Sequence, residues 1–482
     1  MWNSRSFAIA ACVLTAISAR AVEIDTEWIA EGNGNWMDAL NWSAGVPNNV
    51  GEDSFNARID AWNSDVLRTV TLEGAEVTIG NLAFERGRLI VTDAALTVTG
   101  GTTLGGNVPW SPGRLILSVA DSQVDLGSVA AFATGVFDQF KLEVAGGAGD
   151  YVQWKDAAIH TIGADGSLTV TGGAGRLRDS VSGDSALAGL QEVRGELKLQ
   201  EGDYDFAGSL VTTKNSTVEL KNATVNVDGR FEQGGNLRIR EEGSITVAEN
   251  FVHSGKSSFG VAFEDEITFS LTVGGDFEQT GDMQFHGSGS IDVTGHLVNS
   301  GMMNFGTYSE SEVALKIGGD LRQEGELTVN AKGSVEIGGD LVNTSYVTFA
   351  NFYAGSLTAM VAGDLDNTGR LTVFSSEDSG KETVTTVSIQ GGLGQLQNGV
   401  LTAGDYSVYA NGNATAILEW KGADIEVIST GVAVFVGRGG GIRDRETGEN
   451  ALRNLREVNG LLGVADHTVF NALKIGETGD VT

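Results

Sequence analysis

Residues 316–329 read KIGGDLRQEGELTV, and residues 336–349 read EIGGDLVNTSYVTF, so one pattern returns after twenty residues. Copies of this pattern share a leading valine or isoleucine, which occurs at Val227, Val247, Val273, Val293, Ile317, Ile337 and Val361. These leading residues are 20 to 26 positions apart. Such a period, built from alternating apolar residues and glycine-rich turns, is typical of a solenoid that winds one coil per repeat.

The residues within each copy decide between the two solenoids that have a period of this length. A leucine-rich repeat would carry an asparagine–leucine consensus and a helical half, and the chain shows neither. The copies are instead rich in valine, threonine and glycine, which favour strands and tight turns. The sequence therefore predicts an all-β fold, a right-handed parallel β-helix with coils of about 20–28 residues.

Aligning the copies predicts three columns of stacked side chains or turns. Large apolar residues, expected inside the helix, form the first column: Phe277, Leu297, Leu321, Leu341 and Leu365. Amides, expected to hydrogen-bond between coils about 4.8 Å apart, form the second: Gln279, Asn299, Gln323, Asn343 and Asn367. Glycines, expected at a turn with positive φ, form the third: Gly281, Gly301, Gly325 and Gly369.

Acidic residues recur at one further turn position and also cluster in one lengthened coil. The recurring residues are Asp276, Asp320, Asp340 and Asp364. Because Asp320 and Asp340 belong to adjacent coils, their like charges would lie about 5 Å apart. Solvation of these carboxylates is the favoured interpretation, and a bridging Ca²⁺ is the alternative. A second candidate calcium site is Glu264, Asp265 and Glu266, for which a solvated loop is again favoured.

The composition excludes several classes of protein. The 63 acidic residues outnumber the 31 lysines and arginines, and the formal net charge is −32, so a nucleic-acid partner is not expected. Hydrophobic residues make up 41% of the chain, which is too many for a disordered protein. Strong acidity suits a soluble extracellular protein and leaves room for divalent cations.

The first 21 residues have the features of a secretory signal peptide. Arg5 precedes an apolar run over residues 7–17, and Ala19-Arg20-Ala21 resembles a cleavage site. The only cysteine, Cys12, lies within this segment, so disulfides are not expected in the mature chain. No later apolar run approaches the roughly 20 residues of a membrane span. We therefore expect a secreted or cell-surface protein, exported by a Sec-type signal and of bacterial origin.

A tryptophan-rich segment over residues 22–60 precedes the predicted helix of residues 61–482. Trp28, Trp36 and Trp42 lie close together within it. A solenoid needs a cover for the open apolar end of its first coil, and tryptophan is an efficient cover, so a cap is the favoured interpretation. Stacking of the three exposed rings on a glycan is the alternative.

Residues 34–57, GNWMDALNWSAGVPNNVGEDSFNA, resemble the segment that opens many large secreted bacterial proteins with autotransporter-associated β-strand repeats. The coils from Ile79 onward are similar to the passenger regions of that family. The resemblance implies a secreted or surface-displayed right-handed β-helix with a structural or adhesive role, and it supplies no catalytic residues. The C-terminal anchor frequent in the family does not follow, so we expect this chain to be part of a longer protein.

A longer repeat lies over the coils, because residues 152–197 resemble residues 418–462. Trp154 corresponds to Trp420, and Asp179 corresponds to Asp444. The second copy ends near the last residue, which leaves a terminal coil that could dock end to end with another copy.

No metal-binding, nucleophile or phosphate-binding motif occurs in the chain, so we expect no enzyme and no cofactor other than calcium. The favoured function is a structural or adhesive scaffold whose partners are extracellular glycans. The alternatives are a passive spacer and a β-helical lyase or glycosidase of polysaccharides that uses the acidic side loops. A glycosidase would need two carboxylates at a defined separation.

Overall fold

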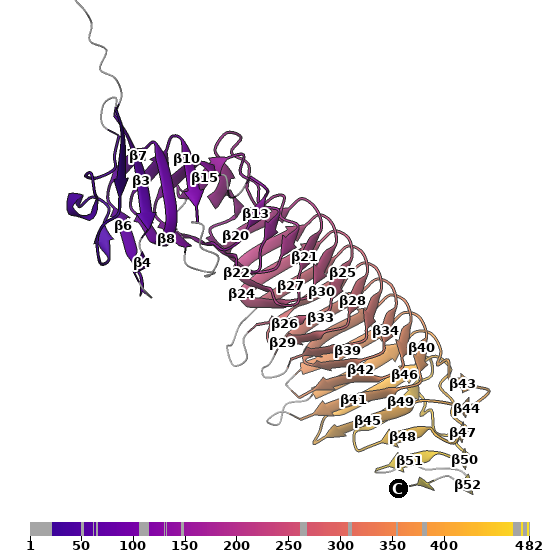
Figure 1. Ribbon diagram of the computed structural model, residues 1–482. Helices are drawn as coiled ribbons and strands as arrows, with labels where there is room; N and C mark the ends of the chain where they lie inside the picture. The colour runs from indigo at the N-terminus through magenta and orange to yellow at the C-terminus, as the bar shows by residue number, and fades with distance from the viewer. Residues whose placement is uncertain are drawn as a thin grey trace, which may run out of the picture.

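The computed structural model describes residues 22–482, except for 50–52, 61, 64–65, 106–114, 130, 132, 146–148, 261–267, 307–310, 353–354, 378–382, 466–473, 476–479 and 482. The predicted signal peptide and the acidic cluster Glu264–Glu266 lie outside the described residues. The described chain is an all-β solenoid of about 15 turns whose strands pair in parallel between successive turns. The prediction of a parallel β-helix is confirmed. Figure 1 shows the turns stacked in chain order from the indigo to the yellow end of the rod.

From Val136 onward each turn passes through three faces, called here the first, second and third face in chain order. The first face consists of short strands: β13 (Val136–Phe137), β16 (Thr161–Ile162), β19 (Glu192–Val193), β21 (Leu210–Thr212), β23 (Phe231–Gln233), β25 (Phe251–His253), β28 (Phe277–Gln279), β31 (Leu297–Asn299), β34 (Leu321–Gln323), β37 (Leu341–Asn343) and β40 (Leu365–Asn367). It continues with β44 (Val400–Leu401), β47 (Val427–Ile428), β50 (Glu457–Val458) and β52 (Lys474–Ile475).

The second face has longer strands. They are β2 (Gly34–Asn35), β6 (Thr69–Glu73), β8 (Asn81–Thr92), β11 (Leu115–Ala120), β14 (Lys141–Ala145), β17 (Ser167–Thr171), β20 (Glu196–Phe206), β22 (Thr217–Val227), β24 (Asn236–Val247), β26 (Lys256–Phe259), β29 (Asp282–Phe285), β32 (Met302–Phe305), β35 (Glu326–Asn330), β38 (Tyr346–Asn351), β41 (Arg370–Ser376), β45 (Asp405–Asn411), β48 (Ala433–Val436), β51 (Leu461–Val464) and β53 (Asp480–Val481).

The third face shares the long strands β8, β20, β22 and β24 with the second. Its own strands are β1 (Glu23–Glu27), β3 (Ser54–Asp60), β7 (Glu76–Ile79), β9 (Ala95–Val98), β10 (Gly101–Leu104), β12 (Gln123–Val129), β15 (Tyr151–Lys155), β18 (Leu177–Asp179), β27 (Thr268–Val273), β30 (Ser288–Val293), β33 (Glu312–Ile317), β36 (Lys332–Ile337), β39 (Gly355–Val361), β42 (Thr383–Ile389), β46 (Thr415–Trp420) and β49 (Gly440–Asp444). Smaller described elements are β4 (Trp62–Asn63), β5 (Val66–Leu67), β43 (Leu396–Gln397) and the 3₁₀ turns η1 (Ala39–Asn41) and η3 (Ala174–Arg176).

Three long strands cross the corner between the second and third faces at a non-glycine residue with positive φ. These residues are Glu201, Asn222 and Glu241, with φ of 51°, 50° and 59°. A left-handed residue changes the direction of a strand within one position, and the strands continue to pair with their neighbours on both sides of it. Pairing between the turns therefore resumes beyond the corner, with a register shift between Lys221 and Ala223 where β22 pairs with β24.

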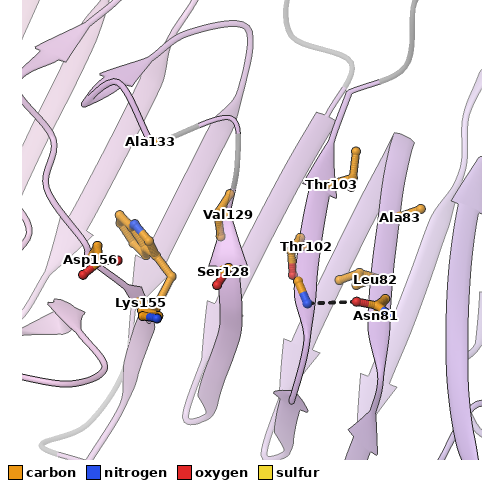
Figure 2. Close-up of a pocket in the computed structure, with 12 residues that line it drawn as sticks. Asn81, Leu82, Ala83, Thr102, Thr103, Ser128, Val129, Ala133, Lys155 and Asp156 are labelled. Carbon is orange, nitrogen blue, oxygen red and sulfur yellow. Dashed lines mark hydrogen bonds between the residues drawn. The ribbon is translucent and has the colours of Figure 1, made fainter.

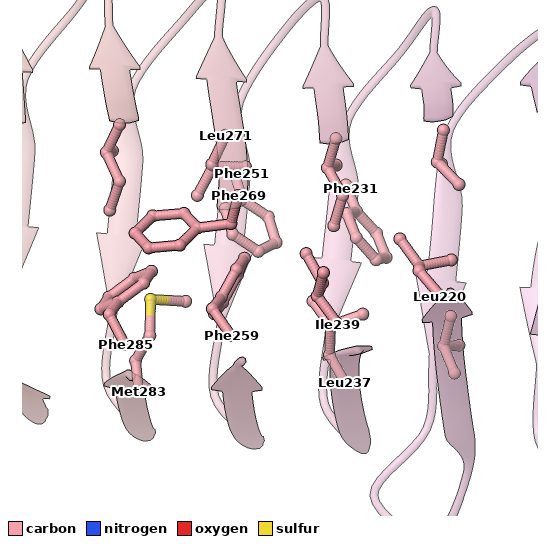
Figure 3. Packing of buried hydrophobic residues seen from close by; sticks show 14 of the residues in the cluster. Leu220, Phe231, Leu237, Ile239, Phe251, Phe259, Phe269, Leu271, Met283 and Phe285 are labelled. Atoms are coloured by element: carbon pink, nitrogen blue, oxygen red, sulfur yellow. The ribbon is translucent and has the colours of Figure 1, made fainter. Parts of the chain in front are cut away.

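The interior is a set of apolar columns that run along the helix axis. The side chains of Phe277, Leu297, Leu321, Leu341 and Leu365 are fully buried and pair in register from turn to turn, as predicted. A second column on the second face stacks Phe259, Phe285 and Phe305, with ring centroids 4.6 and 4.4 Å apart. Figure 3 shows neighbouring rings of this core. Each buried side chain of this size contributes about 1.5–3 kcal/mol, and only the adjacent turns supply its contacts.

The repeated glycines at positions 281, 301, 325 and 369 do not have positive φ, so that part of the prediction is wrong. A Cβ at Gly281 would overlap the carbonyl oxygen of Gly255, and one at Gly301 would overlap the carbonyl oxygen of Gly281. Glycine is needed at this column because the backbones of successive turns approach too closely for a side chain.

Candidate functional site

A lateral groove on the third face crosses strands β8, β10, β12 and β15 and has a volume of about 560 Å³. It lies where β10 is only four residues long. Asn81 accepts a hydrogen bond from the backbone N–H of Gly101 at 3.0 Å, and the hydroxyl of Thr102 donates to the carbonyl of Leu126 at 2.7 Å. Figure 2 shows Thr103, Ser128 and Lys155 among the side chains around this groove.

The ionisable groups of this groove are few. Among the described residues that line it, Asp156 is the carboxylate and Lys155 is the cation. Asp156 has a φ of 57°, which turns the chain directly after β15. Hydrolysis of a glycosidic bond uses a pair of carboxylates on opposite sides of the bond. The described lining of this groove supplies one carboxylate.

A second groove adjoins the first and shares Asn81 and Ala83 with it. Its charged lining residues are Asp25, Glu27 and Arg58. The guanidinium of Arg58 lies 3.0 Å from Glu85 and 3.5 Å from Glu27, and its hydrogen bond to Glu85 is the main cause of its raised pKa. A guanidinium held in this way is an ion-pair partner and not a base.

The predicted acidic column forms a ladder of hydrogen bonds along the corner that leads into the first face. Each side chain accepts a hydrogen bond from the backbone N–H of the corresponding residue in the next turn. The accepting atom is Oδ1, or Nδ1 in His296, and the bonds are Asp276–His296 (2.8 Å), His296–Asp320 (2.9 Å), Asp320–Asp340 (2.9 Å), Asp340–Asp364 (2.8 Å) and Asp364–Gly392 (2.8 Å). The carboxylates therefore join the turns together.

The same ladder explains the glycine that precedes each aspartate in the repeated GGD motif. A Cβ at Gly339 would overlap Oδ1 of Asp320, and one at Gly363 would overlap Oδ1 of Asp340. Within the described residues, no group of three or more His, Cys, Asp or Glu side chains is placed to hold a metal ion. The structure gives this column a structural role, because each side chain accepts a hydrogen bond from the next turn.

The predicted amide column is fully buried at its five predicted positions. Asn299 donates to the side-chain oxygen of Gln323 at 2.9 Å, and Asn343 donates to that of Asn367 at 2.7 Å. The same two amides also reach backbone carbonyls of the following turn, those of Glu326 and Arg370. The predicted inter-coil bonds are therefore present, with side-chain pairs at these two steps of the column.

The three N-terminal tryptophans are buried, with 5%, 0% and 3% of Trp28, Trp36 and Trp42 exposed. The ring of Trp42 packs edge-to-face against both others, with centroids 5.2 and 4.9 Å apart. The indole N–H of Trp36 donates to the carbonyl of Pro47 at 3.2 Å. Sugar stacking requires an accessible ring face, so the glycan prediction is wrong for these residues, and the rings form an apolar cluster in the first turns.

The two copies of the long repeat have the same local structure. Trp154 pairs in register with Asp179 across β15 and β18, and Trp420 pairs with Asp444 across β46 and β49. Each aspartate accepts hydrogen bonds from three backbone N–H groups of the loops around it. The N–H of Ser182 is the main cause that holds the pKa of Asp179 at about 2. In Asp444, burial opposes the shift, but hydrogen bonds led by the Thr447 N–H still lower the pKa.

The structure also brings together four aromatic residues that sequence reasoning missed. Phe352, Phe374, Tyr409 and Phe435 lie on successive turns at one edge of the second face. The signal in the sequence is one aromatic residue per coil over four coils. Unequal coil lengths hide it, because the separations are 22, 35 and 26 residues.

Among the described residues, no helix is long and apolar enough to span a membrane. Comparisons of this chain with protein-family models, with curated proteins and with solved structures found no match.

Proposed function

We propose that this protein is an exported, acidic and rigid scaffold that works outside the cell, with a structural or adhesive role. The proposal rests on the contacts of the repeated polar residues. The aspartate ladder and the buried amides, the two most regular polar features, both hydrogen-bond from one turn to the next. A side chain committed to the adjacent turn stiffens the rod and is not free for catalysis.

The lateral groove supports the same proposal over a polysaccharide-active enzyme. The described lining residues supply one carboxylate, Asp156, and one ammonium group, Lys155. In the adjoining groove, the guanidinium of Arg58 is occupied by ion pairs. A scaffold needs no paired acid and base, whereas a glycosidase does.

The proposal is tested by the size, location and inertness of the native protein. Cell fractionation and intact-mass measurement should find it at the surface or in the medium, processed after Ala21. Small-angle scattering of the purified chain should give a rod, since about 15 turns at about 4.8 Å each span about 70 Å. Release of reducing ends from a panel of polysaccharides, abolished by Asp156→Asn, would replace the scaffold with an enzyme.

A further inference from the structure

The aromatic residues Phe352, Phe374, Tyr409 and Phe435 form a column of contacting rings, called here the aromatic column, which is exposed at its two ends and buried at Phe374. Phe352 directly follows β38, and the other three lie within β41, β45 and β48, which are neighbours in the lower half of Figure 1. Consecutive ring centroids are 4.8, 4.8 and 5.9 Å apart. The column therefore advances by about one ring per turn along the helix axis.

The column lies on the outside of the helix, unlike the other phenylalanine stacks. Phe352 is 44% exposed and Phe435 is 42% exposed, whereas Phe259, Phe285 and Phe305 in the core are fully buried. Tyr409 is half-buried, and Phe374 is buried between its two neighbours in the column, with 6% of it exposed. Placing large aromatic surface in water is unfavourable unless a ligand or partner covers it.

Hydrogen-bonding side chains flank the rings on both sides along the strands. Residues two apart on a strand point to the same side, so Thr372 and Ser376 flank Phe374. On the next turn, Ser407 and Asn411 flank Tyr409, and each is in register with the corresponding residue of β41. Apolar ring faces bordered by hydroxyl and amide groups match a sugar ring, which has apolar C–H faces and hydroxyl edges.

The negative charge of the protein favours a neutral sugar over an anionic one. The carboxylate of Glu377 is fixed beside it, because it accepts a hydrogen bond from the backbone N–H of Asn413 at 2.7 Å. The whole chain has a net charge of −32. A uronate or sulfated polymer would be repelled, whereas a neutral one would not.

We propose that the aromatic column binds a neutral polysaccharide whose chain runs along the helix axis. The exposed rings of Phe352 and Phe435 lie at opposite ends of the column, so they favour an extended ligand that spans several turns. The proposal goes beyond the scaffold role, since a rod of this length would serve as a spacer without any ligand. It also assigns the adhesive surface to the C-terminal half of the described chain and not to the tryptophans of the first turns.

The test measures retention of the full mature chain on insoluble cellulose, chitin and xylan, with polygalacturonate as the anionic polymer. We expect retention on at least one neutral polymer and none on polygalacturonate. The double variant Phe352→Ser/Phe435→Ser removes the two exposed rings and should weaken binding by about five-fold or more. The matched control is Tyr346→Ser, because Tyr346 is 55% exposed on β38 but lies outside the column.

Three results would overturn the proposal. One is no retention on any of the neutral polymers. Another is equal retention of the double variant and the parent chain. The third is a loss of self-association in the double variant by sedimentation, without a change in sugar binding, which would assign the column to a second copy of this chain. Circular dichroism of each variant establishes that it is folded, and none of these results would alter the export or rod shape of the protein.

Discussion

At the scale of single residues, a histidine replaces an amide at one buried position of the repeat. His253 occupies the buried amide column, where Gln233 and Gln279 lie in the turns on either side. It is fully buried, and its Nε2 lies 2.7 Å from the hydroxyl of Ser257. Burial lowers its pKa to about 4. A polar column that accepts Gln or His without change of backbone thus acquires a pH-sensitive position by one substitution.

His253 makes the folded protein less stable in mild acid. An unfolded histidine, with a pKa near 6.5, takes up a proton before the folded one does, so stability falls as pH drops from about 6.5 to about 4. His253→Gln should remove this term, which is worth about 2 kcal/mol between pH 8 and pH 5. Denaturant unfolding at both pH values measures it. The exposed His160→Gln control should keep the parental difference, and an equal difference in H253Q would show that other groups cause it.

Gly301 tests the close approach of successive turns. Gly301→Ala places a Cβ against the carbonyl oxygen of Gly281, so we expect a loss of about 2 kcal/mol in the free energy of unfolding. Gly208→Ala is the control, since no atom lies within 4 Å of its added Cβ and its φ is not positive. Thermal melts of both variants compare them. If the two variants lose the same stability, backbone entropy and not steric overlap explains the glycine column.

At the scale of elements, the aspartate ladder joins each first-face strand to the turn before it. The side chain in one turn caps a backbone N–H in the next, as an N-cap residue does in a helix. Asn250 and His296 hold the same column and make the same contact, which shows that the acceptor matters and the charge does not. This is a physical account of a motif that by itself resembles a cation site.

Substitutions of Asp340 distinguish a hydrogen-bonded ladder from a bound Ca²⁺. Asp340→Ala removes the acceptor for the N–H of Asp364 and should cost about 1 kcal/mol, whereas Asp340→Asn should be close to the parent protein. Addition of a chelator should leave the melting temperature of the parent unchanged. A drop in melting temperature on chelation that is absent in Asp340→Asn would favour a bound Ca²⁺ instead.

At the scale of the whole molecule, stability is local because each turn contacts only its neighbours. A destabilising substitution at one end of the solenoid should therefore not destabilise distant turns. The tryptophan cluster offers the test, since Trp36 is fully buried and Leu40, in the same segment, is 85% exposed.

Trp36→Ala should speed amide hydrogen exchange in β1 and β3 and leave β34 and β37 unchanged. The physical reason is that a lost indole removes several kcal/mol of packing from the first turns alone. Hydrogen exchange followed by mass spectrometry gives the pattern, with Leu40→Ala as a neutral control. Faster exchange along the entire rod would mean that the solenoid unfolds as one cooperative unit.

The regular part of the fold could be predicted because the same residue types recur at equivalent positions of each coil. The inner column at Phe277 and Leu297, the amides at Asn299 and Asn343, and the parallel pairing all follow from the period. The reason for the glycine at position 301 could not be predicted, because it depends on the distance between two backbones. Burial of the N-terminal tryptophans agrees with the favoured interpretation of a cap, but their edge-to-face packing depends on the tertiary structure.

The sequence by itself determined that this protein is a parallel β-helix, because burial of alternating side chains needs the next coil and therefore repeats in register. Only the tertiary structure decided which residues of unequal coils meet. It directed the side chains of Asp320 and Asp340 to the backbone of the next turn. It also aligned Phe352, Phe374, Tyr409 and Phe435 on one edge, although up to 35 residues separate consecutive members in the chain. The physical reason is that loops of variable length shift the numbering but not the strand register, and the register places side chains side by side.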